Sequence, residues 1–187
     1  MPLENTLASS LLLAMPGMDD PNFSRTAVLV CQHDGEGAMG VVLNRRTDVL
    51  LGELFEQLGI EGAAREMKGR QVLWGGPVQV DRGFVLHKPI GSWQSTLQVR
   101  NDIGLTTSKD ILTALGQGEG PTQVLITIGY AGWSAGQLEN EIRQNAWLTV
   151  AADASTLFDT PPEGRMSGAL GLLGIDLSRL SEQAGHA

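Results

Sequence analysis

The sequence contains a single cysteine, Cys31, so it cannot form an internal disulfide and lacks the ligands of a cysteine-based zinc cluster. A chain without disulfides fits a reducing compartment, and we expect a cytoplasmic protein. Long hydrophobic runs are also lacking. The first apolar run, residues 11–15, is far shorter than a membrane span and follows no lysine or arginine. We therefore expect no membrane association and interpret this run as a buried strand.

Basic residues are scarce as well. The 13 lysines and arginines stand against 21 aspartates and glutamates, which gives a net charge of −8. A field of this sign repels phosphate backbones and anionic lipid surfaces. The only adjacent basic pair is Arg45-Arg46, and no basic recognition helix is present. Direct nucleic-acid binding is therefore disfavoured, and the expected partner is a small ligand or another protein.

Aromatic residues make up only 5% of the chain, whereas 42% of its residues are hydrophobic. In 187 residues this is enough apolar material for one buried core, and the length is too short for two comfortable ones. We expect a single domain over residues 1–187, with its core at about 7–177 and a polar tail at 178–187. The sequence leaves the oligomeric state open and is compatible with a monomer.

Short apolar runs bounded by turn residues predict strands along most of the chain. They lie at residues 11–15, 27–31, 39–43, 71–74, 84–87, 98–100, 105–107, 123–128 and 147–151. The continuous run at 123–128 is typical of a strand buried on both faces and is predicted at the centre of the sheet. Helices are predicted at 51–58, after Ser108, after Ser134 and from Pro162, without steady strand-helix alternation. The expected fold is α/β (α+β), a mixed, mainly antiparallel β-sheet or flattened barrel flanked by helices.

Ser134 is the serine of a G-x-S-x-G sequence between a predicted strand and a predicted helix. This is the context of a hydrolase nucleophile, which also needs an acid and then a histidine later in the chain. The only later histidine is His186, in the polar tail. We interpret Ser134 instead as the N-cap of the helix, in a capping box with Gln137, and expect Glu139 to pair with Arg143.

Cys31 and His33 are two residues apart, so on a regular strand their side chains point to the same face. A neighbouring imidazole can lower the pKa of a thiol and produce a reactive thiolate. The alternative is an inert core cysteine, since free cysteine is among the most buried residue types.

The segment Gly75-Gly76-Pro77 separates two predicted strands and is typical of a tight hairpin turn. Alternatively, its backbone N–H groups form a nest for an anion, with Arg82 and Lys88 as countercharges. The sequence has no metal-ligand spacing, dinucleotide fingerprint or Walker motif. We therefore predict neither a metal nor a cofactor.

Several longer segments resemble the YqgE/AlgH family. They lie at residues 13–18, 31–44, 75–78, 82–87, 129–133, 136–139 and 145–148, and the resemblance runs from about residue 11 to 175. It implies one compact α/β domain and, through the name AlgH, a link to the regulation of alginate production. In the family pattern the position of Ser134 is not reserved for serine. The chain departs from that pattern at Arg165-Met166, where a tryptophan is expected.

The resemblance also indicates a candidate binding surface, formed by the residues that match the family pattern. They are Cys31, His33, Asn44, Gly75, Gly76, Pro77, Arg82, His87, Trp133, Gln137, Glu139, Asn145 and Trp147. The favoured hypothesis is a non-enzymatic regulatory or binding protein, with no catalytic residue assigned. The alternative is a thiol-based redox switch or hydrolase-like enzyme that uses Cys31 with His33 or His87 as the base.

Overall fold

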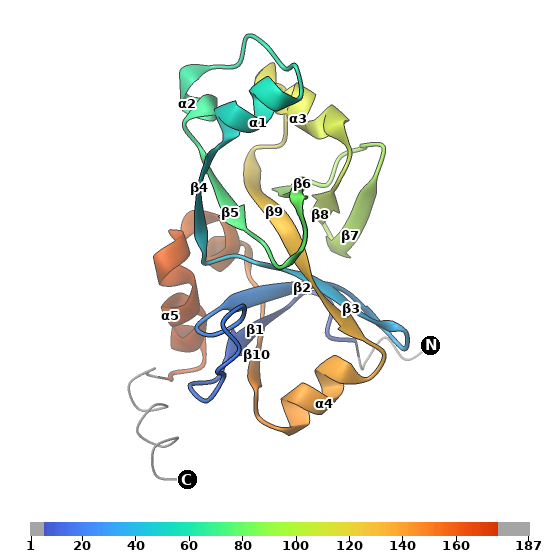
Figure 1. Cartoon of the computed structure of the whole chain (residues 1–187), viewed down its shortest axis with the longest axis vertical. Helices are drawn as coiled ribbons and strands as arrows, with labels where there is room; N and C mark the ends of the chain where they lie inside the picture. The colour runs from blue at the N-terminus through green and yellow to red at the C-terminus, as the bar shows by residue number, and fades with distance from the viewer. Residues whose placement is uncertain (1–5, 176–187) are drawn as a thin grey trace.

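The apolar runs form the strands of one ten-stranded sheet in the computed structural model, which describes residues 6–175 (Figure 1). The strands are β1 (Ser10–Ala14), β2 (Ala27–Asp34), β3 (Gly37–Val42), β4 (Arg46–Leu50), β5 (Gln71–Trp74), β6 (Val78–Lys88), β7 (Thr96–Arg100), β8 (Ile103–Thr106), β9 (Gln123–Ser134) and β10 (Trp147–Ala151). The helices are α1 (Leu51–Gln57), α2 (Arg65–Lys68), α3 (Lys109–Gly116), α4 (Gln137–Arg143) and α5 (Pro162–Leu172), with a π-helical turn, η2 (Ser155–Asp159), before α5. The predicted strands and helices are all present. β4, α2 and η2 were not predicted, because each is short and has no regular apolar pattern. The predicted polar tail at 178–187 lies outside the described residues.

Strand β9 is the centre of the sheet, as predicted. The strand order is β10-β1-β2-β3-β9-β6-β8-β7, and β4 and β5 form a branch in which β5 is parallel to β9. All other pairings are antiparallel, so the mixed, mainly antiparallel sheet is confirmed. β10 and β7 are at opposite ends of this order, so the sheet is open. The alternative of a flattened barrel is wrong.

Three apolar clusters form the core, and each lies beneath different helices. Phe55 of α1 and Ile111 of α3 belong to one cluster, and Leu157 of η2 and Ala169 of α5 belong to a second. Leu138 of α4 lies in the third. Figure 1 shows the same division, with α1 and α3 at one end of the sheet, α4 at the other end, and α5 beside β4 and β5. None of the described helices is long and apolar enough to cross a membrane.

The link between β5 and β6 crosses over β9 and does not turn back as a hairpin. Thr127 and Ile128 of β9 pair with β5 on one side and with β6 on the other. The chain must therefore pass from one side of β9 to the other within Gly75-Gly76-Pro77. The predicted hairpin at this segment is wrong, because the strands it joins share a neighbour and do not pair with each other.

Glycine is required at this crossing because two backbones pack directly against each other. The N–H of Gly75 donates to the carbonyl of Ile128 at 2.8 Å. A Cβ added to Gly76 would overlap the backbone of Tyr130, and one added to Gly129 would overlap the carbonyl oxygen of Gly76. Gly129 also has a φ of +79°, which side chains disfavour.

The crossing does not form the predicted anion nest. Its space is filled by the backbone of β9. The guanidinium of Arg82 lies over the ring of Phe84, 5.9 Å from its centroid. Lys88 pairs with Gln123 at the far end of β6.

The substitution Gly129→Ala should lower the free energy of unfolding by at least about 2 kcal/mol, because it combines a disfavoured φ with a backbone overlap. Urea unfolding followed by circular dichroism measures the change. Gly83→Ala is the matched control, since a Cβ at Gly83 meets no atom within 4 Å. Equal stability of the two variants would show that the crossing is not closely packed.

Candidate functional site

The predicted surface residues that the structure brings together lie around α4. They are His33, Trp133, Gln137, Glu139 and Trp147, with Asn145 just after the helix. The others are spread over the sheet: Cys31, Asn44, Gly75, Gly76, Pro77, Arg82 and His87. The two groups have different environments.

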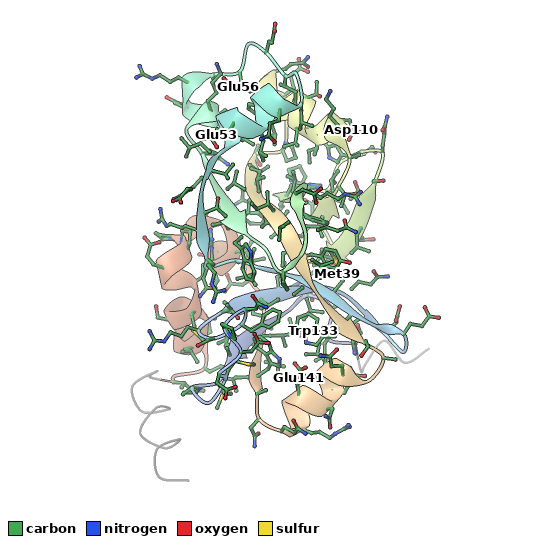
Figure 2. All side chains as sticks on the ribbon, viewed as in Figure 1. Met39, Glu53, Glu56, Asp110, Trp133 and Glu141 are labelled. Carbon is green, nitrogen blue, oxygen red and sulfur yellow. The ribbon has the colours of Figure 1, made fainter. Side chains whose placement is uncertain are left out.

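Glu141 of α4 connects two buried tryptophans, although no sequence motif marks it. Its Oε1 accepts hydrogen bonds from the indole N–H of Trp133 at 3.1 Å and from that of Trp147 at 2.9 Å. Figure 2 shows Glu141 on α4 close to Trp133. Its Oε2 accepts from Nε2 of Gln137 at 2.9 Å. Phe23 packs on both indoles, with ring centroids 6.1 and 5.8 Å away. Every polar group of this cluster is therefore paired, and the tryptophans act as core residues.

The start of α4 differs from the predicted capping box. The N-cap is Gly136, and Ser134 is the last residue of β9. Ser134 does bond to Gln137, since its backbone N–H and its hydroxyl both donate to Oε1, at 3.0 and 3.2 Å. The hydroxyl is thus used to fix the strand-to-helix turn. The later histidine that a hydrolase would need, His186, lies outside the described residues.

His33 joins strand β2 to α4 through Glu139. Its Nδ1 accepts the backbone N–H of Leu7 at 3.0 Å, so the neutral ring carries its proton on Nε2 and donates it to Oε1 of Glu139 at 3.2 Å. A hydrogen bond from its own backbone N–H lowers the pKa of Glu139, and His33 and the charge of Arg143 add to this effect. The predicted Glu139–Arg143 contact is not formed as an ion pair in the described chain, because Glu139 points to His33.

Two predicted asparagines hold backbone turns. Asn145 has a φ of +61° and ends α4, where the N–H of Ala146 donates to the carbonyl of Glu141 and that of Asn145 donates to Ile142. This is a Schellman motif, in which asparagine tolerates the left-handed position. Asn44 accepts the N–H of Ala27 and donates to the carbonyl of Arg25, both at 2.9 Å. Their roles are structural.

Cys31 and His33 lie on opposite faces of β2, so the prediction that they share a face is wrong. The register between β2 and β3 shifts between Val30 and Gln32, and this β-bulge turns the following residues over. Cys31 is buried in the cluster beneath α5, whereas His33 points to α4. Burial raises the pKa of the Cys31 thiol to about 12.

His87 is fully buried and lies at the other end of β9 from His33. It pairs with Val124 at the start of β9, while His33 pairs with Ala38, whose partner is Trp133 near the end of β9. Nδ1 of His87 donates to the carbonyl of Pro89 at 3.0 Å, so Nε2 accepts the hydroxyl of Thr106 at 2.7 Å. Burial lowers the pKa of His87. The structure therefore does not assemble a Cys31–histidine pair.

A cleft of about 410 Å³ lies between α5, η2 and the strands β5 and β9. It is lined by Arg70, Gln71, Leu73, Thr122, Gln123, Val124, Leu125, Ile126, Phe158, Asp159, Pro162 and Arg165. Arg165 is only 4% exposed, and its Nη1 donates to the carbonyl of Leu43. Its Nε is buried without a hydrogen-bond partner among the described residues.

None of the residues selected from the sequence lines this cleft, although one signal lay beside it. The chain departs from the pattern of the family it resembles at Arg165-Met166. A buried charge without a full set of partners is costly and is a mark of a binding site. A second hollow, of about 420 Å³ between β2, β3 and β7, is lined by Gln32, Met39, Gln94, Ser95, Thr96, Leu97, Leu105 and Thr107. None of these side chains is charged at neutral pH.

Comparisons with known proteins support the resemblance. A model of the family described as AlgH-like matches residues 11–178. The chain belongs to the AlgH-like family. A UPF0301 protein of Dechloromonas aromatica is 51% identical over 181 residues, covering 97% of both chains, and one of Thiobacillus denitrificans is 53% identical over 186 residues, covering 99% of this chain and 100% of the relative.

Two solved structures have the same fold as this AlgH-like chain. The solution structure of the AlgH protein from Pseudomonas aeruginosa has a TM-score of 0.82 and 48% identity, and the match covers 98% of this chain and 97% of that one. A crystal structure of protein DIP2367 from Corynebacterium diphtheriae has a TM-score of 0.69 over 92% and 90% of the two chains. At 18% identity, the second match speaks for the fold alone.

In the AlgH-like chain, Glu141→Ala should lower the free energy of unfolding by about 2–3 kcal/mol, because it leaves two buried indole N–H groups without an acceptor. Urea unfolding followed by tryptophan fluorescence reports the change directly. Glu141→Gln is the control, since its amide oxygen keeps an acceptor in place and should cost less. If Glu141→Ala and Glu141→Gln had the same free energy of unfolding, the hydrogen bonds to the indoles would contribute nothing to stability.

Cys31 of the native AlgH-like chain should resist alkylation by iodoacetamide at pH 8, because the thiol is buried and its pKa is about 12. Mass spectrometry of the labelled protein measures the modified fraction. The same reaction in urea is the control and should go to completion. Rapid, complete labelling without denaturant would contradict the buried, protonated thiol.

Proposed function

We propose that this AlgH-like protein is a cytoplasmic, non-enzymatic regulatory binding protein that takes up a small ligand in the cleft beneath α5. The observation that carries the proposal is Arg165, a buried guanidinium that lines the cleft and has an unpartnered Nε. An unpaired buried charge is destabilising by itself, so a ligand that completes its hydrogen bonds supplies the reason for its position. The volume of about 410 Å³ lies in the range of small-molecule sites.

The α4 surface is a weaker candidate for this role. Its polar side chains already satisfy one another through Glu141 and through the His33–Glu139 contact. A ligand would have to replace these bonds, whereas Arg165 at the cleft beneath α5 makes only one side-chain hydrogen bond within the described chain. The thiol alternative is also weaker, because Cys31 is buried and contacts neither His33 nor His87.

A titration followed by amide-resolved NMR tests the proposal with a panel of nucleotides, sugar phosphates, carboxylic acids and neutral aromatic compounds. We expect at least one compound to shift the amides of Gln71, Gln123 and Phe158, which line the cleft. Gln71→Trp places a bulky ring at the cleft and should abolish the shifts. Gln98→Trp, on an exposed position of β7 outside the cleft lining, should leave them unchanged.

Two results would contradict the proposal. One is a panel in which no compound shifts the cleft amides. The other is binding that Gln71→Trp and Gln98→Trp affect equally. Broadening around α4 with a clarified lysate fraction, without shifts at the cleft, would favour a macromolecular partner at the α4 surface instead.

A further inference from the structure

The guanidinium of Arg165 has one nitrogen engaged and two without a partner. Among the described residues, its side chain makes a single hydrogen bond, from Nη1 to the carbonyl of Leu43. Nε is buried and has no partner, so it is not open to the cleft. Nη2 makes no hydrogen bond to the described chain and is not among its buried unpartnered atoms, so it is the donor that a ligand can reach. A charged N–H donor of this kind forms a strong hydrogen bond to a carboxylate or phosphate oxygen.

The neighbouring charges leave this edge incompletely compensated. Arg46 and Glu163 neutralise each other, since Nη2 of Arg46 lies 2.6 Å from Oε2 of Glu163. The charged side chains that line the cleft are then two positive ones, Arg70 and Arg165, and one negative one, Asp159. Desolvation lowers the pKa of Arg165 to about 10, although Glu163 acts in the opposite direction. The cleft therefore has a local excess of positive charge in a chain whose net charge is −8.

The rest of the cleft is apolar on one side and carries amides on another. Leu125 and Phe158 pack against the core cluster beneath α5 and still line the cleft. Gln71 and Gln123 supply amide groups, and Nε2 of Gln123 lies 3.5 Å from Oδ1 of Asp159. A bare inorganic ion would leave the apolar wall uncovered. A ligand with an apolar body and one oxyanion group would contact both parts.

We propose that the cleft beneath α5 binds a small amphipathic anion, whose carboxylate or phosphate group is held by Nη2 of Arg165 and whose apolar body lies against Leu125 and Phe158. This inference rests on the proposed function and specifies its ligand class. Arg70, which is exposed and lines the cleft, adds long-range attraction for the anion.

The test compares benzoate with benzamide, which have the same shape and differ in charge, and adds phenyl phosphate and inorganic phosphate. Amide shifts and the side-chain Nε–Hε resonance of Arg165 are followed by NMR. We expect benzoate or phenyl phosphate to shift that resonance and the cleft amides, and to bind at least about tenfold more tightly than benzamide. Inorganic phosphate should bind more weakly than phenyl phosphate. The stronger of benzoate and phenyl phosphate identifies which oxyanion the site prefers.

Variants separate the contribution of Arg165 from that of general charge. Arg165→Met should weaken binding of the anion at least about tenfold and leave benzamide unchanged, while Arg165→Lys keeps the charge, loses the planar donor group and should fall between. Because Arg165 bonds to the carbonyl of Leu43 and Arg70 to that of Val124, the amide spectrum of each variant is compared with wild type. Arg70→Gln tests the site at an exposed position, and Arg82→Gln is its control with the same charge change outside the cleft lining.

The outcomes distinguish this inference from the proposed function. Equal binding of benzoate and benzamide at the cleft would overturn the anion inference and leave ligand binding intact. The anion inference would also be overturned if a neutral compound of the panel shifted the cleft amides and none of the three anions did. Equal effects of Arg70→Gln and Arg82→Gln would also overturn it. If no compound of any kind shifts the cleft amides, both proposals fall.

Discussion

The structure depends on the pairing of β9 along its whole length. Its first half pairs with β6, Thr127 and Ile128 also pair with β5 on the other side, and its last four residues pair with β3. The change of neighbours happens around Gly129, where the link from β5 to β6 passes over the strand. Because that link carries no side chain at Gly75 or Gly76, β9 continues without interruption and joins the two parts of the sheet. The helices are placed by this arrangement: α1 and α3 cover one part, and α4 covers the other.

Most buried polar groups of the sheet and its helices have hydrogen-bond partners, so a buried polar atom without a partner is informative. Glu141 accepts from two indoles, and His87 has partners at both ring nitrogens. Such groups specify one packing arrangement and have no capacity left for a ligand. Within the described chain, buried side-chain polar atoms without a partner are Nε1 of Trp93 and Nε of Arg165. Only the second belongs to a charged group whose residue lines a cleft, and this is the ground on which we propose a ligand there.

The sequence predicts the elements of this fold better than their three-dimensional relations. Periodicity located β9 as the central strand and α1 by its leucine spacing, because burial on one or both faces leaves a local pattern. The bulge at Cys31 leaves no such pattern, since one extra residue in a strand looks like regular alternation until its partner is known. The crossing at Gly75-Gly76 was equally hidden, because a glycine pair fits a hairpin as well as a close backbone contact. Both errors concern contacts between residues distant in the sequence.

The candidate site was missed for a related physical reason. Several residues that match the family pattern hold the fold: Asn145 ends a helix, and Gly75 and Gly76 allow the crossing. Arg165 lies where the chain departs from that pattern, at Arg165-Met166. The guanidinium of Arg165 offers five donors and a permanent charge, and no local pattern in the sequence shows how many of those donors find partners. That depends on which carbonyls and side chains the strands β5 and β9 and the turn η2 bring next to α5. An unpartnered buried donor is therefore a property of the packed fold, and it becomes visible only when elements distant in the sequence are placed together.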